Sequence, residues 1–102
     1  MYIIYFVTDL QNIKIGFTNQ DIKKRIQQLS TGNSSKIYLI GFRQGSINDE
    51  KYLHTKFMNE KSHGEWFKPV KEILDYINIQ NEMNHTVECE DGKLMIYKKM
   101  KC

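Results

Sequence analysis

Two stretches near the start of the chain, one continuously apolar and one alternating between apolar and polar residues, predict a β-hairpin. Residues 2–7 (YIIYFV) are apolar, β-branched or aromatic, and in residues 12–18 (NIKIGFT) Ile13, Ile15 and Phe17 alternate with polar or small neighbours. A period of two is typical of a strand that buries one face. The turn-prone sequence TDLQ joins the two predicted strands.

Three stretches repeat apolar residues every three or four positions and predict helices. The first follows the N-cap candidates Thr18 and Asn19 and ends at Gly32, because glycine commonly terminates a helix. The second starts with a capping box of Ser46 and Asp49, and the third starts after Pro69. Their apolar positions are Ile22, Ile26 and Leu29; Ile47, Leu53 and Phe57; and Val70, Ile73, Leu74 and Ile77.

The remaining pattern completes a mixed α/β (α+β) fold. Residues 36–42 (KIYLIGF) predict a third strand, and HGEWF at 63–67 predicts a turn. The order strand–strand–helix–strand–helix–helix favours a three-stranded antiparallel sheet flanked by helices. We therefore expect one domain over residues 1–77. Residues 78–102 are expected to form a polar linker (78–85) and a C-terminal β-hairpin that turns at Asp91-Gly92.

Composition and charge narrow the class of protein. The 102 residues allow one modest core, and no apolar run approaches the roughly 20 residues that span a bilayer. The first strand lacks the features of a signal peptide, and Cys89 and Cys102 are expected to be free thiols, so we expect an intracellular, cytoplasmic protein. The net charge of +3 arises in residues 1–80, which is a mild indication of a polyanionic partner.

Several polar residues occupy positions that packing would give to apolar ones. Glu50 lies on the apolar stripe of the second helix, three residues after Ile47 and three before Leu53, although a buried carboxylate needs a partner. A phenol, an amine, a guanidinium, an imidazole and carboxylates together suit phosphodiester hydrolysis. The candidate residues are Tyr5, Lys14, Arg25, Glu50, His54 and Glu65.

Each candidate also has a purely structural interpretation. Arg25 could pair with Asp21 one turn earlier, and Glu50 could pair with Arg25 or Lys51 as an ion pair. His54 could be a hydrogen-bonded packing residue. Taken singly, these structural interpretations are favoured over catalytic ones.

Four blocks of sequence, in order, resemble the GIY-YIG nuclease superfamily. IIY at 3–5 and KIG at 14–16 stand at the positions of its two tripeptides, Arg25 follows on the next helix, and Glu50 stands at the position of its metal-binding glutamate. The longer series K-I-G, R-x-x-Q-L-x-T-G, E-x-x-L-H-x-x-F and G-E-W-F is similar to a small phage- and virus-rich branch of that superfamily. The resemblance covers residues 2–77.

The resemblance implies a mechanism, and the chain also departs from the superfamily pattern at several positions. Glu50 would hold one Mg²⁺ or Mn²⁺ ion per active site, Arg25 would bind the scissile phosphate, and Tyr5 would activate the attacking water. Ile3 replaces a glycine, Lys14 replaces the second tyrosine, and Leu29 stands where some branches have a histidine. His54 would supply the histidine from the later helix, and Glu65 lies near the position of a missing asparagine, with its role left open.

We therefore expect a metal-dependent endonuclease that acts on DNA in preference to RNA, with low intrinsic sequence specificity and no membrane association. Phosphate contacts are expected from Lys23, Lys24, Arg25 and Lys36. A phage or viral origin would place the activity in a host cell. Two alternatives stay open: a catalytically weak nucleic-acid-binding module, and an inhibitor-like interaction protein that binds a partner through its C-terminal hairpin.

Overall fold

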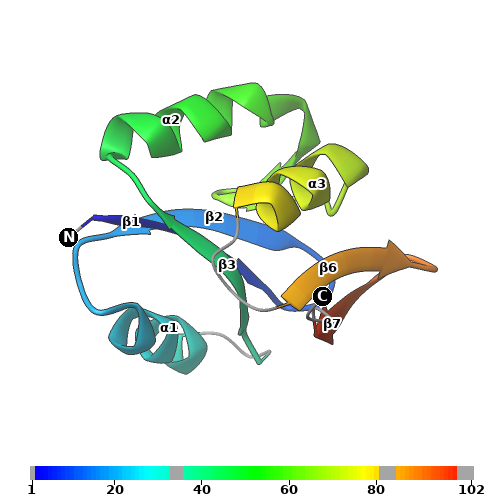
Figure 1. Cartoon of the computed structure of the whole chain (residues 1–102), viewed down its shortest axis with the longest axis horizontal. Helices are drawn as coiled ribbons and strands as arrows, with labels where there is room; N and C mark the ends of the chain where they lie inside the picture. The colour runs from blue at the N-terminus through cyan, green and yellow to red at the C-terminus, as the bar shows by residue number, and fades with distance from the viewer. Residues whose placement is uncertain (1, 33–35, 81–84, 99–102) are drawn as a thin grey trace.

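Two antiparallel sheets and three α-helices make up the computed structural model, which describes residues 2–32, 36–80 and 85–98 (Figure 1). The main sheet has the strand order β3-β1-β2-β5-β4, and β6 and β7 form a separate hairpin. In chain order the elements are β1 (Ile3–Thr8), β2 (Ile13–Thr18), α1 (Ile22–Thr31), β3 (Tyr38–Gln44), α2 (Ile47–Lys56), the 3₁₀ turn η1 (Met58–Glu60), β4 (Lys61–His63), β5 (Trp66–Phe67), α3 (Lys71–Gln80), β6 (His85–Glu90) and β7 (Lys93–Lys98).

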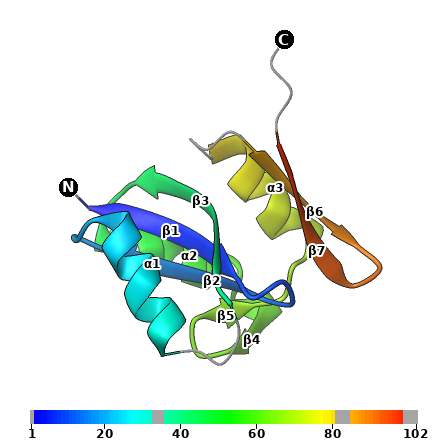
Figure 2. The ribbon, with the colours of Figure 1, turned by 90° about the horizontal axis from the view of Figure 1, so that it is seen from below.

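The predicted α+β class with an antiparallel sheet, flanking helices and a C-terminal hairpin is confirmed. The three predicted strands form one side of the main sheet, and β5 and β4 extend it to five strands beyond β2 (Figure 2). The predicted turn at 63–67 is right for Gly64 and Glu65 and wrong for the residues on either side, which pair as strands. Strands of two or three residues are too short to show an alternating pattern.

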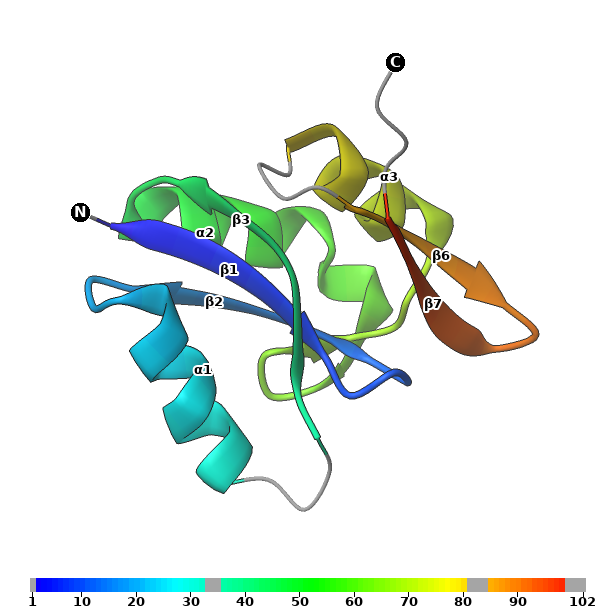
Figure 3. The same cartoon turned by 60° about the horizontal axis from the view of Figure 1, so that its bottom comes forward.

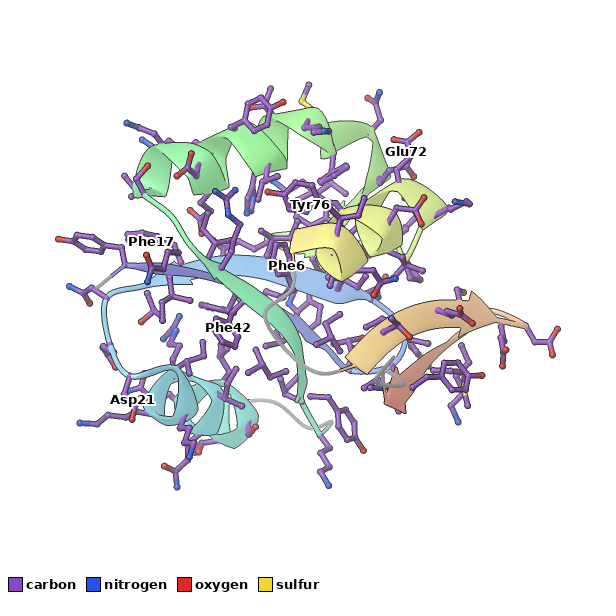
Figure 4. The ribbon with its side chains drawn as sticks, in the orientation of Figure 1. Phe6, Phe17, Asp21, Phe42, Glu72 and Tyr76 are labelled. Carbon is purple, nitrogen blue, oxygen red and sulfur yellow. The ribbon has the colours of Figure 1, made fainter. Side chains whose placement is uncertain are left out.

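Helices cover both faces of the main sheet. Helix α1 lies on one face, and α2 and α3 lie on the other (Figures 1 and 3). Successive side chains of a strand point to opposite faces of a sheet. Phe6 of β1 points to the face covered by α3, where its ring meets the Tyr76 ring with centroids 6.0 Å apart. Phe42 of β3 instead points toward α1 (Figure 4). The side chains of the candidate site residues divide between these same two faces.

The expected helix caps agree with the structure at α2 and differ at the start of α1. Asp21 caps α1 by accepting from the Lys23 N–H, so the cap candidates Thr18 and Asn19 are wrong; Thr18 is the last residue of β2. The capping box of Ser46 and Asp49 is confirmed. Ile47, expected on the buried stripe from sequence, is the first residue of α2 and is 48% exposed, so that expectation is wrong.

The C-terminal hairpin packs on the same core as the main sheet. Val87 and Leu94 are buried in the main apolar cluster, and the Asn78 side chain hydrogen-bonds both the N–H and the C=O of Val87. The Leu94 N–H donates to Leu10 O in the β1–β2 turn. Asp91 and Gly92 have positive φ angles of 52° and 77°, which confirms the predicted hairpin turn.

The predicted linker and cysteines are only partly within the described residues. Residues 78–80 continue α3 and residue 85 begins β6, while 81–84 lie outside the described ranges. Cys89 is a free, exposed thiol, and Cys102 also lies outside those ranges. Among the described helices, none has the length and apolarity needed to cross a membrane.

Shortening Leu94 should destabilise the whole domain. Leu94→Ala removes a side chain that is 1% exposed from the main core, and we expect a loss of about 2–5 kcal/mol in the free energy of unfolding. Ile96→Ala, on the same strand but 37% exposed, is the matched control and should cost much less. Urea denaturation measures both; equal losses would contradict the burial of β7 in the core.

Candidate active site

The open side of β2 organises the candidate site. Strand β5 pairs with β2 only at Ile13 and Lys14. The N–H and C=O of Ile15, which point to this side of β2, therefore have no partner in a described strand. Its N–H donates to the backbone oxygen of Glu65 at 3.3 Å, and its carbonyl lies 2.9 Å from Nε2 of His54. A buried backbone group needs a partner, and here the turn before β5 and a side chain of α2 supply them.

His54 is fixed in one orientation by these contacts. Its ring lies edge-on to Phe67, with centroids 5.1 Å apart, and the neighbouring Leu53 is fully buried. Because the Ile15 carbonyl can only accept, Nε2 donates, and Nδ1 of the neutral ring keeps a lone pair. Metal-binding histidines commonly donate their second ring N–H in this way, and the same contacts also fulfil the hydrogen-bonded packing role considered from sequence.

Two carboxylates converge on this histidine. One possible ligand atom from each of Glu50, His54 and Glu65 lies within 4.8 Å of the other two. Burial raises the pKa of Glu50, and the charge of Glu65 raises it further, while His54, Lys14 and Lys51 act in the opposite direction. A group of two carboxylates and an imidazole is a donor set that suits a divalent cation.

Lys14 is not a solvated strand residue. Its side chain is 16% exposed, and its Nζ lies 3.2 Å from Oε1 of Glu65. The same nitrogen is 5.9 Å from the centre of the Trp66 ring. Lys14 therefore places one positive charge beside the carboxylate pair.

Tyr5 and Arg25 form a second group on the α1 face of the sheet. Tyr5 is 1% exposed, and its cross-strand partner is Gly16, where an added Cβ would lie 2.2 Å from Cζ of the Tyr5 ring. The ring therefore lies directly against the β2 backbone. Arg25 donates from Nε to the Tyr5 hydroxyl oxygen at 3.3 Å and from Nη1 to Gln28 at 3.4 Å.

The ion pairs considered from sequence are not formed in the described part of the chain. The Arg25 guanidinium contacts Tyr5 and Gln28 rather than the Asp21 carboxylate, and Glu50 has neither Arg25 nor Lys51 within ion-pair distance. The purely structural explanations for these two charged residues therefore lose their proposed partners.

The structure brings the six predicted candidates together around residues 14–16. Tyr5 lies on Gly16, Arg25 is bonded to Tyr5, Lys14 is bonded to Glu65, and His54 is bonded to Ile15, with Glu50 beside His54. Lys14 and Gly16 are two residues apart on one face, or about 7 Å. The predicted phosphate contacts Lys23, Lys24 and Lys36 are exposed and lie outside this cluster.

Two features of the site were missed from sequence. The first is the steric role of Gly16, which only the register between β1 and β2 reveals. The second is the side chain of Trp66, which stacks with His63 beside Lys14. The sequence predicts a turn over residues 63–67, which include both rings. A strand of two residues has no pattern from which their alignment with Lys14 could be predicted.

Comparison with known protein families identifies a match over most of the chain. A family model described as the T5orf172 domain matches residues 1–85, which include every residue of the cluster. No curated protein and no solved structure matches the chain significantly.

Adding a methyl group at Gly16 should disrupt the Tyr5 position. Gly16→Ala forces the buried ring to move, and we expect a loss of about 1–3 kcal/mol in the free energy of unfolding. Gly32→Ala is the matched control, because its Cβ would meet no atom closer than 3.9 Å and its φ of −87° suits alanine. Denaturant titration separates them; an unchanged Gly16→Ala variant would show that the ring does not lie against Gly16.

Glu50 should make the metal-free protein less stable as the pH rises. A raised pKa means that the folded state binds the proton of Glu50 more tightly than the unfolded state, so ionisation at higher pH costs stability. Glu50→Gln cannot ionise and should melt at a higher temperature than the wild type at pH 7. This advantage should disappear below the usual carboxyl value of 4.5.

Thermal melts at a series of pH values with a chelator present measure this effect. Glu88→Gln, an exposed carboxylate on β6, is the control and should show no comparable gain. A Glu50→Gln advantage that is the same at acidic and neutral pH would contradict the assigned cause.

Proposed function

The chain belongs to the T5orf172 domain family, and on this premise we propose that it is a metal-dependent endonuclease of the GIY-YIG type acting on DNA. The family is phage-associated and nuclease-like, which supports a nucleic-acid substrate in general. The observation that carries the finer proposal is the convergence of a phenol, a guanidinium, a lysine, an imidazole and two carboxylates on residues 14–16 of one strand.

Glu50, Glu65 and His54 are the residues that would hold a divalent cation. Their possible ligand atoms lie within 4.8 Å of one another, and burial, with a further contribution from the charge of Glu65, raises the pKa of Glu50. Mg²⁺ prefers oxygen ligands, whereas an imidazole favours later metals, so this set favours Mn²⁺ over Mg²⁺. The ion would supply positive charge to the phosphate oxygens during hydrolysis.

Arg25 is suited to bind the scissile phosphate. Its Nε is already bonded to Tyr5, so the guanidinium is held in place before substrate arrives and retains N–H donors for phosphate oxygens. A pre-oriented donor stabilises the charge that develops in the transition state without reorganisation.

Tyr5 is assigned to the attacking water. The Arg25 Nε–H donates to its oxygen, and Gly16 leaves room for its ring against the strand, so the hydroxyl is fixed at the edge of the cluster. In the proposed reaction the Tyr5 oxygen first releases its own proton to solvent, and the resulting phenolate orients the water and takes its proton. Lys14 has three N–H donors and can contact phosphate while one of them stays on Glu65.

A second candidate function is binding of a protein partner through the C-terminal hairpin. Met95, Ile96 and Tyr97 are consecutive on β7 and between 37% and 39% exposed. Deleting residues 78–102 would not test this cleanly, because Val87 and Leu94 belong to the main core. Exchange of the three exposed side chains for serine leaves the core intact and is the better test: partner capture that survives it would exclude this surface.

Removing the Glu50 carboxylate should abolish cleavage. We expect the wild type to cut single- or double-stranded DNA with Mn²⁺ or Mg²⁺ but not with EDTA, at sites with little sequence preference. Glu50→Gln should cut at least roughly 10²-fold more slowly and bind Mn²⁺ more weakly by calorimetry. Glu88→Gln, distant from the cluster on β6, should match the wild type.

The outcomes of this assay separate the competing functions. Equal metal-dependent cutting by wild type and Glu50→Gln would remove Glu50 from the site. Salt-sensitive DNA binding without cutting by the wild type would favour the binding module, with Lys14 in place of a tyrosine as the point at which the chemistry was lost.

A further inference from the structure

Three side chains form a row across the edge of the main sheet beside the candidate site. Lys14 of β2 is the cross-strand partner of Trp66 in β5, and Trp66 is the partner of His63 in β4. The rings of Trp66 and His63 are stacked, with centroids 6.2 Å apart and planes inclined by 18°. The row thus consists of one cation and two parallel aromatic rings.

The stack is anchored at one end and open at the other. Trp66 is half-buried and packs against the apolar cluster of Tyr5, Val7 and Ile37 under α1. His63 is exposed, as are all three residues of β4, so the outer ring buries little area and adds little to the core. Ser62 Oγ lies 3.0 Å from His63 Nδ1 and restrains the ring.

We propose that the Trp66–His63 stack is a platform on which an unpaired nucleobase stacks, so that the preferred substrate is single-stranded or locally unpaired DNA. This inference rests on the proposed nuclease function and specifies the form of its substrate. Base stacking on an aromatic ring tolerates any sequence, because every base has a π face. In duplex DNA both faces of each base are already covered by neighbouring bases.

The position of the platform fits a strand that also reaches the cluster. Lys14 contacts both Glu65 and the Trp66 ring, so the platform adjoins the carboxylates directly. Tyr5 lies on β1 and His63 on β4, and the order β1-β2-β5-β4 places these strands three strand spacings apart, or about 14 Å in total. Stacked nucleotides rise by about 3.4 Å, so roughly four of them cover this distance. Exposed Lys61 and Lys68 flank the two short strands and can contact the phosphates.

Trp66 is the only tryptophan in the chain, so its fluorescence reports on the platform. In the Glu50→Gln background, a short single-stranded oligonucleotide should quench it. An oligonucleotide with the same number of phosphates but abasic sites, and a duplex, should quench it far less. His63→Ala should weaken binding of the single strand roughly tenfold with little effect on the duplex.

Two control variants distinguish stacking from a structural role. His63→Phe keeps an aromatic face and should restore single-strand affinity. Tyr52→Ala removes an aromatic side chain that is 62% exposed on α2, away from this row, and should leave affinity unchanged. The melting temperature of each variant shows whether the fold is retained.

The platform and the nuclease activity fail in different ways. Equal affinity and quenching for the normal and abasic strands would overturn the platform while leaving metal-dependent cutting intact. Base-dependent quenching by a wild-type protein that cuts no DNA would overturn the nuclease and retain the platform as a single-strand binding surface.

Discussion

The hydrogen-bonding requirement of one strand residue determines where the functional groups of this domain meet. Ile15 is fully buried, yet β5 is too short to pair with it, so its N–H and C=O must be bonded by something other than a strand. The Glu65 backbone satisfies the N–H, and the His54 imidazole satisfies the C=O. These two bonds hold the turn before β5 and helix α2 against the same point, which brings Glu65, His54 and Glu50 together.

The site therefore lies around an edge of the sheet rather than on one of its faces. Tyr5, Arg25 and Lys14 come from the face under α1, while Glu50 and His54 come from the face under α2. Gly16 makes this arrangement possible, because a side chain there would displace the Tyr5 ring. Under the proposed function, a substrate phosphate at this edge would meet Arg25 from one side and the metal held by the carboxylates from the other.

The sequence predicted those helices and strands whose apolar residues recur at regular intervals. The helices and longer strands repeat apolar residues over several positions, and Asp91-Gly92 has the backbone conformation that its composition predicts. Strands β4 and β5 have no such signal and depend on pairing with β2. The site residue types could be predicted, but their partners could not, since the His54–Ile15 bond joins residues 39 positions apart and depends on how α2 docks.

The lysine at position 14 has a consequence that a tyrosine there would not have. Glu50 and Glu65 bring two negative charges together; burial raises the pKa of Glu50, and the charge of Glu65 raises it further. The ammonium of Lys14, bonded to Glu65, offsets part of that charge in the metal-free protein, which a neutral phenol could not do. If the proposed function holds, the Lys14–Glu65 ion pair would compete with a divalent ion for Glu65, so Lys14 would lower metal affinity while it stabilises the metal-free cluster. In the proposed reaction, carboxylates neutralised by a bound metal would leave the Lys14 ammonium available to a substrate phosphate.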